Sequence, residues 1–309
     1  MKRDFLTVTD LREDEVRTLL RETARLKRRR TIGRHALANR TIALVFEKPS
    51  LRTRVSFEVA IRQLGGSSIF LGPDEVQLGE REPIKDVART LSRYVDAIVL
   101  RMLRHRQVEG FARYASVPIL NGLSELHHPC QALADLFTIQ ERFGKLKGLV
   151  ISYIGDGNNV LHSLSQGASL LGANLHVATP NGYRPDRGIW SQVVRQAKAH
   201  HARIVLRDDP EAVVSRADVI YTDVWASMGD EQEQGIRRKA FRQFQVNRKL
   251  LRLAKPHCLV MHCLPAHRGE EITENVLEGP RSIVFDQAEN RLHVQKALLL
   301  MLFAGKMPR

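Results

Sequence analysis

The sequence predicts an α/β protein made of two doubly wound parallel-sheet domains, with the active site in the cleft between them. Short apolar runs alternate with segments of helical periodicity, which is typical of parallel sheets covered by helices on both faces. The alternation restarts after Lys145–Gly148, a candidate domain joint, and 309 residues suffice for two cores. We therefore expect domains at residues 1–147 and 148–290, with a C-terminal helix of about 291–309 packing back on the first.

The first domain opens with a helix that Thr9 or Asp10 can cap, and the leucines up to Leu26 fall on one side of it. A long helix is expected from Pro129, because proline is favoured at the first helical position. Shorter helices are expected at residues 55–64, 87–94 and 111–115. The apolar runs expected to form buried strands are residues 41–46, 67–71, 97–100 and 118–120.

The second domain repeats this pattern. A helix is expected at residues 161–171, and a last helix at 292–303 is apolar enough to dock on the rest of the protein. Its expected strands are residues 149–154, 175–178, 203–206, 219–221 and 258–261. Because ligands bind at the carboxyl ends of parallel strands, we expect functional side chains at those ends.

The segment 46–54 joins the first strand to a helix through a turn that contains Pro49. A helix N-terminus offers unpaired N–H groups and the positive end of the helix dipole. The segment adds two hydroxyl groups and two guanidinium groups, from Ser50, Thr53, Arg52 and Arg54. The combination predicts an anion cradle, most simply for phosphate, although a capped helix with solvated arginines is the alternative. Arg101 ends another strand at the same edge of the sheet.

Composition and charge restrict the class of protein. The net charge of +14 suits an anionic metabolite or a basic surface, and the 6% of aromatic residues do not alternate with basic ones as in a platform for single-stranded nucleic acid. The basic run at 25–34 ends the first helix, which favours a solvated face. No apolar run approaches a membrane span of about 20 residues, and the N-terminus has no secretory signal. Three cysteines fit a reducing compartment, so we expect a cytoplasmic protein that binds neither nucleic acid nor membrane.

Other chemistries are disfavoured by spacing. Gly155-Asp156-Gly157 follows a strand, but Val160 stands where a dinucleotide fingerprint requires a third glycine. No CxxC or HxxxH pair and no G-x-S-x-G elbow is present, so we expect neither a cofactor, a metal nor a serine nucleophile. By spacing alone, Asn159 is a ligand-binding residue or a helix cap, and Cys263 is a small buried hydrophobic residue as readily as a functional thiol.

Six motifs occur in one order and span nearly the whole chain: FEKPSLRTRVSFE at 46–58, HPCQ at 128–131, GDGNN at 155–159, TDVWASMG at 222–229, HCLP at 262–265 and ENR at 289–291. This series resembles the ornithine carbamoyltransferases. The SxRTR and HPxQ motifs are shared with the wider aspartate/ornithine carbamoyltransferase family, whereas the SMG and HCLP motifs point to ornithine. The family's usual threonine after Ser50 is Leu51 here, which removes a hydroxyl group but keeps the backbone N–H.

The resemblance implies the reaction of carbamoyl phosphate with L-ornithine to give L-citrulline and phosphate, in arginine biosynthesis, by a cytoplasmic homotrimer. It implies these residues for carbamoyl phosphate: Ser50, Leu51 (through its backbone), Arg52, Thr53, Gln77 from a neighbouring subunit, Arg101, His128, Gln131 and Arg291. It implies these for ornithine: Asn159, Asp223, Ser227, Met228, Cys263 and Leu264. The implied catalytic residues are Arg101, His128 and Cys263.

In the implied mechanism a neutral amine attacks the carbamoyl carbon, and Cys263 serves as a nearby thiolate or proton acceptor rather than as a nucleophile. Gly229 is a candidate hinge for a loop that closes over ornithine. Two alternatives stay open from the sequence. The acceptor amine could be putrescine, lysine or acetylornithine, and a non-catalytic protein could use the basic run at 25–34 for binding.

Overall fold

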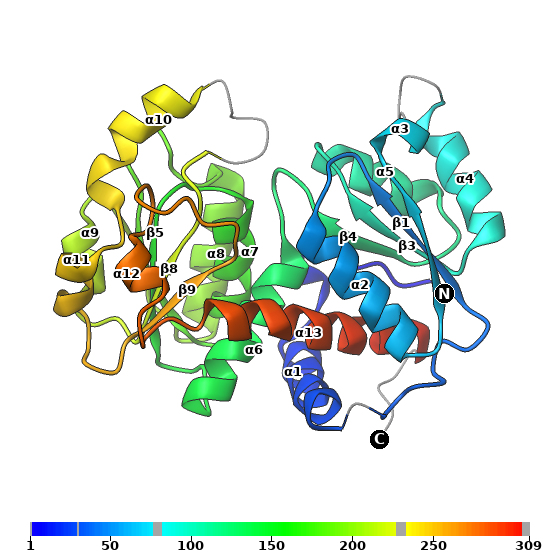
Figure 1. The fold of residues 1–309 in the computed structure, drawn as a ribbon, viewed down its shortest axis with the longest axis horizontal. Helices are drawn as coiled ribbons and strands as arrows, with labels where there is room; N and C mark the ends of the chain where they lie inside the picture. The colour runs from blue at the N-terminus through cyan, green and yellow to red at the C-terminus, as the bar shows by residue number, and fades with distance from the viewer. Residues whose placement is uncertain (1, 30, 77–81, 227–232, 305–309) are drawn as a thin grey trace. The chain divides into compact units, whose positions relative to one another are not determined.

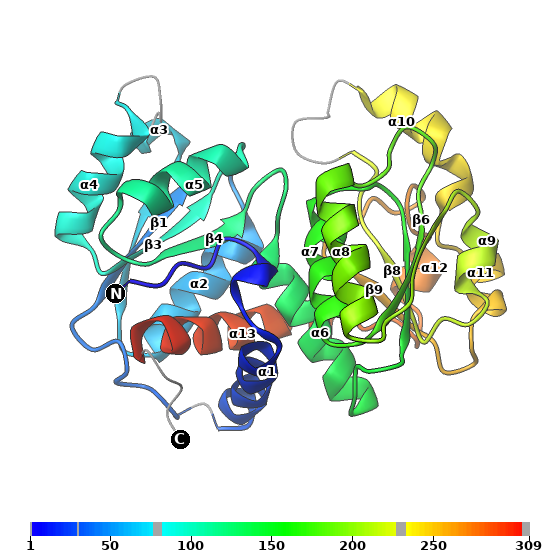
Figure 2. The same cartoon turned by 180° about the vertical axis from the view of Figure 1, so that it is seen from behind.

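The computed structural model describes residues 2–29, 31–76, 82–226 and 233–304. The chain forms two compact units, Met1–Phe137 with Asn290–Arg309 and Thr138–Glu289. Each unit contains one parallel sheet with helices on its two faces (Figures 1 and 2). The predicted fold class of two doubly wound α/β domains is confirmed, whereas the sequence-based boundary at 147/148 and the cleft between the domains stay predictions.

The first unit has four strands in the order β2-β1-β3-β4, all parallel. The strands are β1 Thr41–Phe46, β2 Ser67–Leu71, β3 Ala97–Arg101 and β4 Ile119–Leu123. The helices up to the end of this sheet are η1 Val8–Asp10, α1 Glu13–Arg28, α2 Leu51–Gln63, α3 Pro73–Val76, α4 Ile84–Tyr94 and α5 His105–Tyr114. Two longer helices follow later in the chain, α6 Pro129–Phe143 and α13 Val284–Ala304.

Alternation along the central strands explains how the first sheet is covered. Ala43 and Val45 of β1 share a buried cluster with Val108 and Phe111 of α5 and Ala88 of α4. Because successive side chains point to opposite faces, the intervening residues face the other layer. Figures 1 and 2 show α4 and α5 on one face and α2 on the other. Helices therefore cover both faces of this sheet, so polar side chains are expected at the ends of its strands.

The second unit has five strands in the order β7-β6-β5-β8-β9, again all parallel. The strands are β5 Val150–Ile154, β6 Asn174–Ala178, β7 Ile204–Arg207, β8 Val219–Thr222 and β9 Leu259–His262. The helices are α7 Asn159–Leu170, α8 Arg187–Ala199, α9 Pro210–Val214, α10 Gln234–Phe241, η3 Arg242–Phe244, α11 Arg248–Leu253 and α12 Glu274–Leu277.

Every residue of α7 is buried, so this helix is a core element of the second unit. On the other face of the sheet, Ile220 and Val260 pack in one cluster with Val214 of α9, Leu250 of α11 and Val276 of α12. Figure 2 shows α7 and α8 on one side of the sheet and α9, α11 and α12 on the other. Among the described helices, none combines the length and the apolar content that a membrane span requires.

The expected strands are all present, with ends shifted by at most a few residues. The last helix begins at Val284 rather than near residue 291, because the buried Val284 packs in the apolar cluster of the second unit and extends the helix backward. Helices α8 to α12 were not expected. They are short or polar on one side, and tertiary packing stabilises them more than their own periodicity.

Candidate active site

The predicted anion cradle lies at the N-terminus of α2, directly after β1. Ser50 is the N-cap residue, and its Oγ accepts a hydrogen bond of 3.3 Å from the backbone N–H of Thr53. Leu51 is the first helical residue and is 75% exposed, so its side chain takes no part in the core. Arg54 differs from the expectation: it lies 3.8 Å over the Phe70 ring and pairs with Glu58, which occupies its guanidinium outside the cradle.

Strand register places Arg101 beside this turn. Arg101 pairs with Phe46 across β3 and β1, and its carbonyl accepts from the N–H of Glu47 at 2.9 Å. The Arg101 side chain is buried although it is charged. The register thus places a guanidinium group at the strand ends, next to the turn from β1 to α2.

Arg291 of α13 reaches the cradle from the far end of the sequence. Its Nη2 donates a hydrogen bond of 2.7 Å to the Thr53 hydroxyl, inside the first unit. Further along α13, Lys296 Nζ donates to Oε1 of Gln63, the last residue of α2, at 3.1 Å. Arg291 therefore joins the cradle through its helix, as the resemblance implies.

The start of α6 adds two more of the predicted residues. Gln131 is buried and donates through Nε2 to Asp135 at 2.8 Å, while its Oε1 accepts no hydrogen bond from the described residues. His128 precedes Pro129, the first residue of α6, and is also buried. Burial lowers the pKa of His128 well below its usual value of 6.5, and the charges of Arg291, Arg101 and Arg52 lower it further. The cradle thus combines three cationic groups with one neutral imidazole.

The depressed pKa of His128 has a measurable consequence for stability. The folded protein keeps the ring neutral, whereas the unfolded chain binds a proton below its usual pKa of about 6.5. The stability contributed above that pH is therefore lost as pH falls, by up to about 1.4 kcal/mol per pH unit. We expect His128→Gln to reduce this loss in urea unfolding curves between pH 7 and 5.

The control for the loss of a histidine is His35→Gln, at an exposed position in the same unit. Equal pH slopes for wild type, His128→Gln and His35→Gln would contradict the assignment of a depressed pKa to His128.

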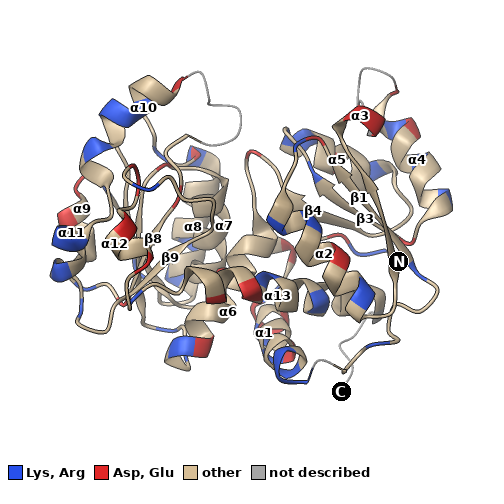
Figure 3. Cartoon of the chain, in the orientation of Figure 1, with Lys and Arg blue, Asp and Glu red and all other residues tan. Residues whose placement is uncertain are grey.

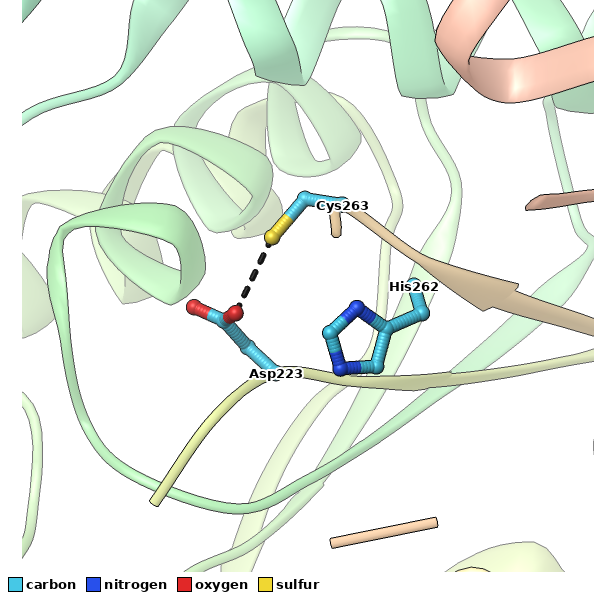
Figure 4. A group of neighbouring side chains, drawn as sticks. All are labelled: Asp223, His262 and Cys263. Carbon is cyan, nitrogen blue, oxygen red and sulfur yellow. Dashed lines mark hydrogen bonds between the residues drawn. The ribbon is translucent and has the colours of Figure 1, made fainter. Parts of the chain in front are cut away.

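The register of the second unit brings two more predicted residues together. Ile154, Thr222 and His262 pair in one row across β5, β8 and β9, so Asp223 and Cys263 leave the sheet side by side. The Cys263 thiol donates to Asp223 Oδ1 at 3.0 Å (Figure 4). The thiol and the carboxylate are therefore linked directly at the carboxyl ends of β8 and β9.

The turn after β5 settles which asparagine caps α7. Asn158 is the N-cap: its Oδ1 accepts from the N–H groups of Val160 and Leu161. Its Nδ2 donates to Asp223 Oδ2 at 2.8 Å, so Asn158 also orients the carboxylate. Asn159 is the first helical residue and is not the cap, and its role in binding a ligand stays a prediction. Sequence reasoning missed Asn158, although two consecutive asparagines at a helix start are a capping signal.

Gly157 has a packing role that the dinucleotide interpretation did not consider. A Cβ at this position would lie 2.3 Å from the backbone nitrogen of Pro185 and 2.4 Å from the Arg184 carbonyl carbon. The glycine is therefore required by the close approach of another loop.

The turn after β9 is held by a buried hydrogen-bond chain. His262 Nδ1 accepts from the N–H of Leu264 at 2.8 Å, so Nε2 carries the proton and donates to Glu271 Oε1 at 3.1 Å. Leu264 has a φ of 58°, a conformation that leucine adopts rarely, and this hydrogen bond holds it there. Gln287 accepts from the His262 N–H and donates to the Tyr221 hydroxyl. Glu271 and Gln287 were missed because nothing in their spacing links them to this turn.

Two groups in the second unit have donor atoms close enough to be considered for a metal ion: Asp223, His262 and Cys263, and His267, Glu270 and Glu271. In the first group both His262 ring nitrogens and the Cys263 thiol are engaged in hydrogen bonds. Those contacts account for the proximity of the side chains without a metal. Gln77, Ser227 and Met228 lie outside the described residues, so their predicted roles stay predictions.

Comparisons with known proteins agree with this geometry. Residues 3–141 match the family model described as the carbamoyl-P binding domain of aspartate/ornithine carbamoyltransferase, and residues 147–302 match its Asp/Orn binding domain. An ornithine carbamoyltransferase from Methanoculleus marisnigri is 50% identical over 309 residues, covering 99% of each chain. The anabolic ornithine carbamoyltransferase of Pyrococcus furiosus is 51% identical over 98% of this chain and 97% of that protein.

Solved structures show the same relationship. The ornithine carbamoyltransferase structure from P. furiosus superposes with a TM-score of 0.95 at 50% identity, covering 99% of this chain and 98% of that one. The anabolic enzyme from Campylobacter jejuni gives 0.94 at 38% identity, covering 99% and 100%. The two family models together cover both units and both groups of polar residues described above. The chain therefore belongs to the aspartate/ornithine carbamoyltransferase family.

Proposed function

We propose that this protein is an ornithine carbamoyltransferase, which transfers the carbamoyl group of carbamoyl phosphate to L-ornithine and yields L-citrulline and phosphate for arginine biosynthesis. The observation that carries the proposal is the match over the full length to relatives of that name at about 50% identity, one of them named as anabolic. The cationic cradle and the carboxylate–thiol pair supply suitable chemistry for the two substrates.

The first unit is proposed to bind carbamoyl phosphate. The N-terminus of α2, with Ser50, the Leu51 N–H, Arg52 and Thr53, suits the phosphate group, because N–H groups and guanidinium forks favour phosphate oxygens. Arg291 is hydrogen-bonded to Thr53 and is proposed to complete this set. Arg101, His128 and Gln131 are proposed to bind the carbamoyl end.

The second unit is proposed to bind ornithine. Asp223 suits the α-amino group and Asn159 the α-carboxylate, with Ser227 and Met228 completing the site. Cys263 and Leu264 are proposed to surround the reacting δ-amine. The Cys263–Asp223 hydrogen bond supports a role in proton transfer, because a proton released by the amine can pass to groups already linked to a carboxylate.

The mechanism follows from these positions. The neutral δ-amine attacks the carbamoyl carbon, a C–N bond forms, and the carbonyl oxygen becomes an oxyanion in the tetrahedral intermediate. The intermediate collapses with cleavage of the bond between carbon and the phosphate oxygen. The proton that the amine loses is taken up by the departing phosphate, with Cys263 and Asp223 as the proposed relay. Arg101 is charged and His128 is a neutral donor, so both can stabilise the oxyanion.

The assembly and the location are proposed on separate grounds. A homotrimer in which Gln77 reaches a neighbouring subunit's site rests on the resemblance described above. A cytoplasmic location is supported by three free cysteines, since such thiols suit a reducing compartment.

The test is citrulline formation from carbamoyl phosphate by the purified protein, with ornithine, putrescine, lysine and acetylornithine run in parallel. We expect strong preference for ornithine. We also expect kcat/KM to rise about tenfold per pH unit from pH 6 to 9, because the attacking amine must be neutral and its pKa is about 10.4.

Preferential turnover of another amine would refute ornithine as the substrate while leaving carbamoyl transfer intact. No turnover with any of the four amines, by a protein that is folded, would refute the enzyme assignment and favour a basic binding protein.

A further inference from the structure

A pocket of about 310 Å³ lies in the second unit, apart from every residue assigned above to a substrate. Arg248 and Arg252 of α11 form one side of it, and Arg281, four residues after α12, lines it as well. Leu251 and Val276, both nearly fully buried, supply an apolar surface in the same pocket. This volume is at the lower end of the range for ligand sites, so the pocket suits a small molecule.

The three guanidinium groups have no carboxylate that offsets them. None of them forms an ion pair with any residue in the part of the chain that the structure describes. The two acids that flank the α12 side, Glu274 and Glu278, are both paired with Arg268. Glu211 is likewise paired with Lys249. These three carboxylates are thus paired with basic residues that do not line the pocket.

The arrangement of these cations is set by the fold. Arg248 and Arg252 are four residues apart, so they project from one side of α11, where like charges are mildly destabilising. Figure 3 shows α11 with basic residues and no acidic one. The Arg281 carbonyl accepts from the N–H of Val260 at 2.8 Å, which ties its backbone to β9. Asn247 caps α11 by accepting from the Leu250 N–H at 3.1 Å. Hydrogen bonds therefore hold both backbone segments that carry the three arginines lining the pocket.

We propose that this pocket binds a small phosphorylated ligand of the nucleotide type. Guanidinium groups form paired hydrogen bonds with phosphate oxygens and stack on flat aromatic rings. Three arginines suit a di- or triphosphate, and a guanidinium plane among them can stack on a base. Asn275, which also lines the pocket, adds an amide that can donate to and accept from base edges or ribose hydroxyls. The site is separate from the phosphate cradle of the first unit.

The experiment is calorimetric titration of the full-length protein with ATP, inorganic tripolyphosphate, inorganic phosphate and adenosine. All proteins carry Arg52→Gln, so that the cradle of the first unit does not contribute to phosphate binding. The test variant adds Arg248→Gln, Arg252→Gln and Arg281→Gln. The matched control adds Arg195→Gln, an exposed arginine on α8 of the same unit.

We expect ATP to bind more tightly than tripolyphosphate, and adenosine to bind weakly. The triple variant should weaken ATP binding by at least about 100-fold, since each charged hydrogen-bonding group contributes about tenfold. The control should change it less than about threefold. If the triple variant does not fold by circular dichroism, single Arg252→Gln and Arg281→Gln variants should each weaken ATP binding about tenfold.

Four outcomes would overturn the proposal: no binding of any probe at millimolar concentration, equal ATP affinity in the triple variant and its parent, an equal loss in the Arg195→Gln control, or ATP binding no tighter than tripolyphosphate. With Arg52 intact, the triple variant should form citrulline at the wild-type rate, so this test is independent of the test of the proposed reaction.

Discussion

Arg101→Gln should lower kcat for citrulline formation by about 10²–10³-fold, the usual loss when one donor to a developing oxyanion is removed. Arg101 ends β3 beside the cradle turn, and its charge contributes to the depressed pKa of His128. Its strand position and its effect on His128 both indicate that the guanidinium lies among the residues of the proposed carbamoyl site. Glutamine keeps two donors and much of the volume but removes the charge.

The measurement is steady-state kinetics with both substrates varied. Arg54→Gln is the matched control, because this arginine is in the first turn of α2, near the cradle, but its guanidinium lies over the Phe70 ring and pairs with Glu58. The control should keep kcat within about threefold of wild type. A second variant, Arg101→Lys, keeps the charge without the planar fork and should recover only part of the rate. Full activity in Arg101→Gln would refute the proposed role.

Asp223→Asn should lower kcat/KM for ornithine by about 10²–10³-fold and leave the affinity for carbamoyl phosphate within about twofold. Asp223 accepts hydrogen bonds from Cys263 and Asn158, and its Oδ1 also accepts from the Val224 N–H. An amide keeps one acceptor oxygen and turns the other position into a donor that faces a donor. The variant therefore loses both the charge that attracts an amino group and the orientation of the thiol.

The control is Asp208→Asn, an exposed carboxylate of the same unit, which should not change kcat/KM. Thermal unfolding of both variants separates a folding defect from a defect in binding. A folded Asp223→Asn protein with wild-type kcat/KM for ornithine would contradict the proposed contact between this carboxylate and the substrate.

Much of the fold could be predicted from the sequence because the strands are short, apolar and separated by turns. Ser67–Leu71 was predicted with its observed ends, and Pro129 begins α6 as its fixed φ favours. The predictions failed where sequence spacing carries little information. Helices α9 and α12 have five and four residues, fewer than periodicity can detect, and they form because they cover the sheet.

In the candidate site, too, features that depend on adjacent residues were predicted, whereas contacts between distant residues were not. The segment from β1 to α2 is local, so its cap, its exposed N–H groups and its hydroxyls follow from adjacent residues. The contribution of Arg54 was misjudged because the competing partner, Phe70, is on another strand. The two uses of Asn158, as a cap and as a partner of Asp223, likewise required the position of a strand more than sixty residues away.

The sequence by itself determined the alternating α/β architecture, the turn from β1 into α2 and the family resemblance, because each depends on neighbouring residues or on ordered motifs. Only the tertiary structure decided that Arg291 joins Thr53, that Glu271 orients the turn after β9, and that three arginines line one pocket. These contacts join residues through strand register and helix packing. Their physical basis is the burial of both sheet faces, which brings distant polar groups to shared edges where they must find partners.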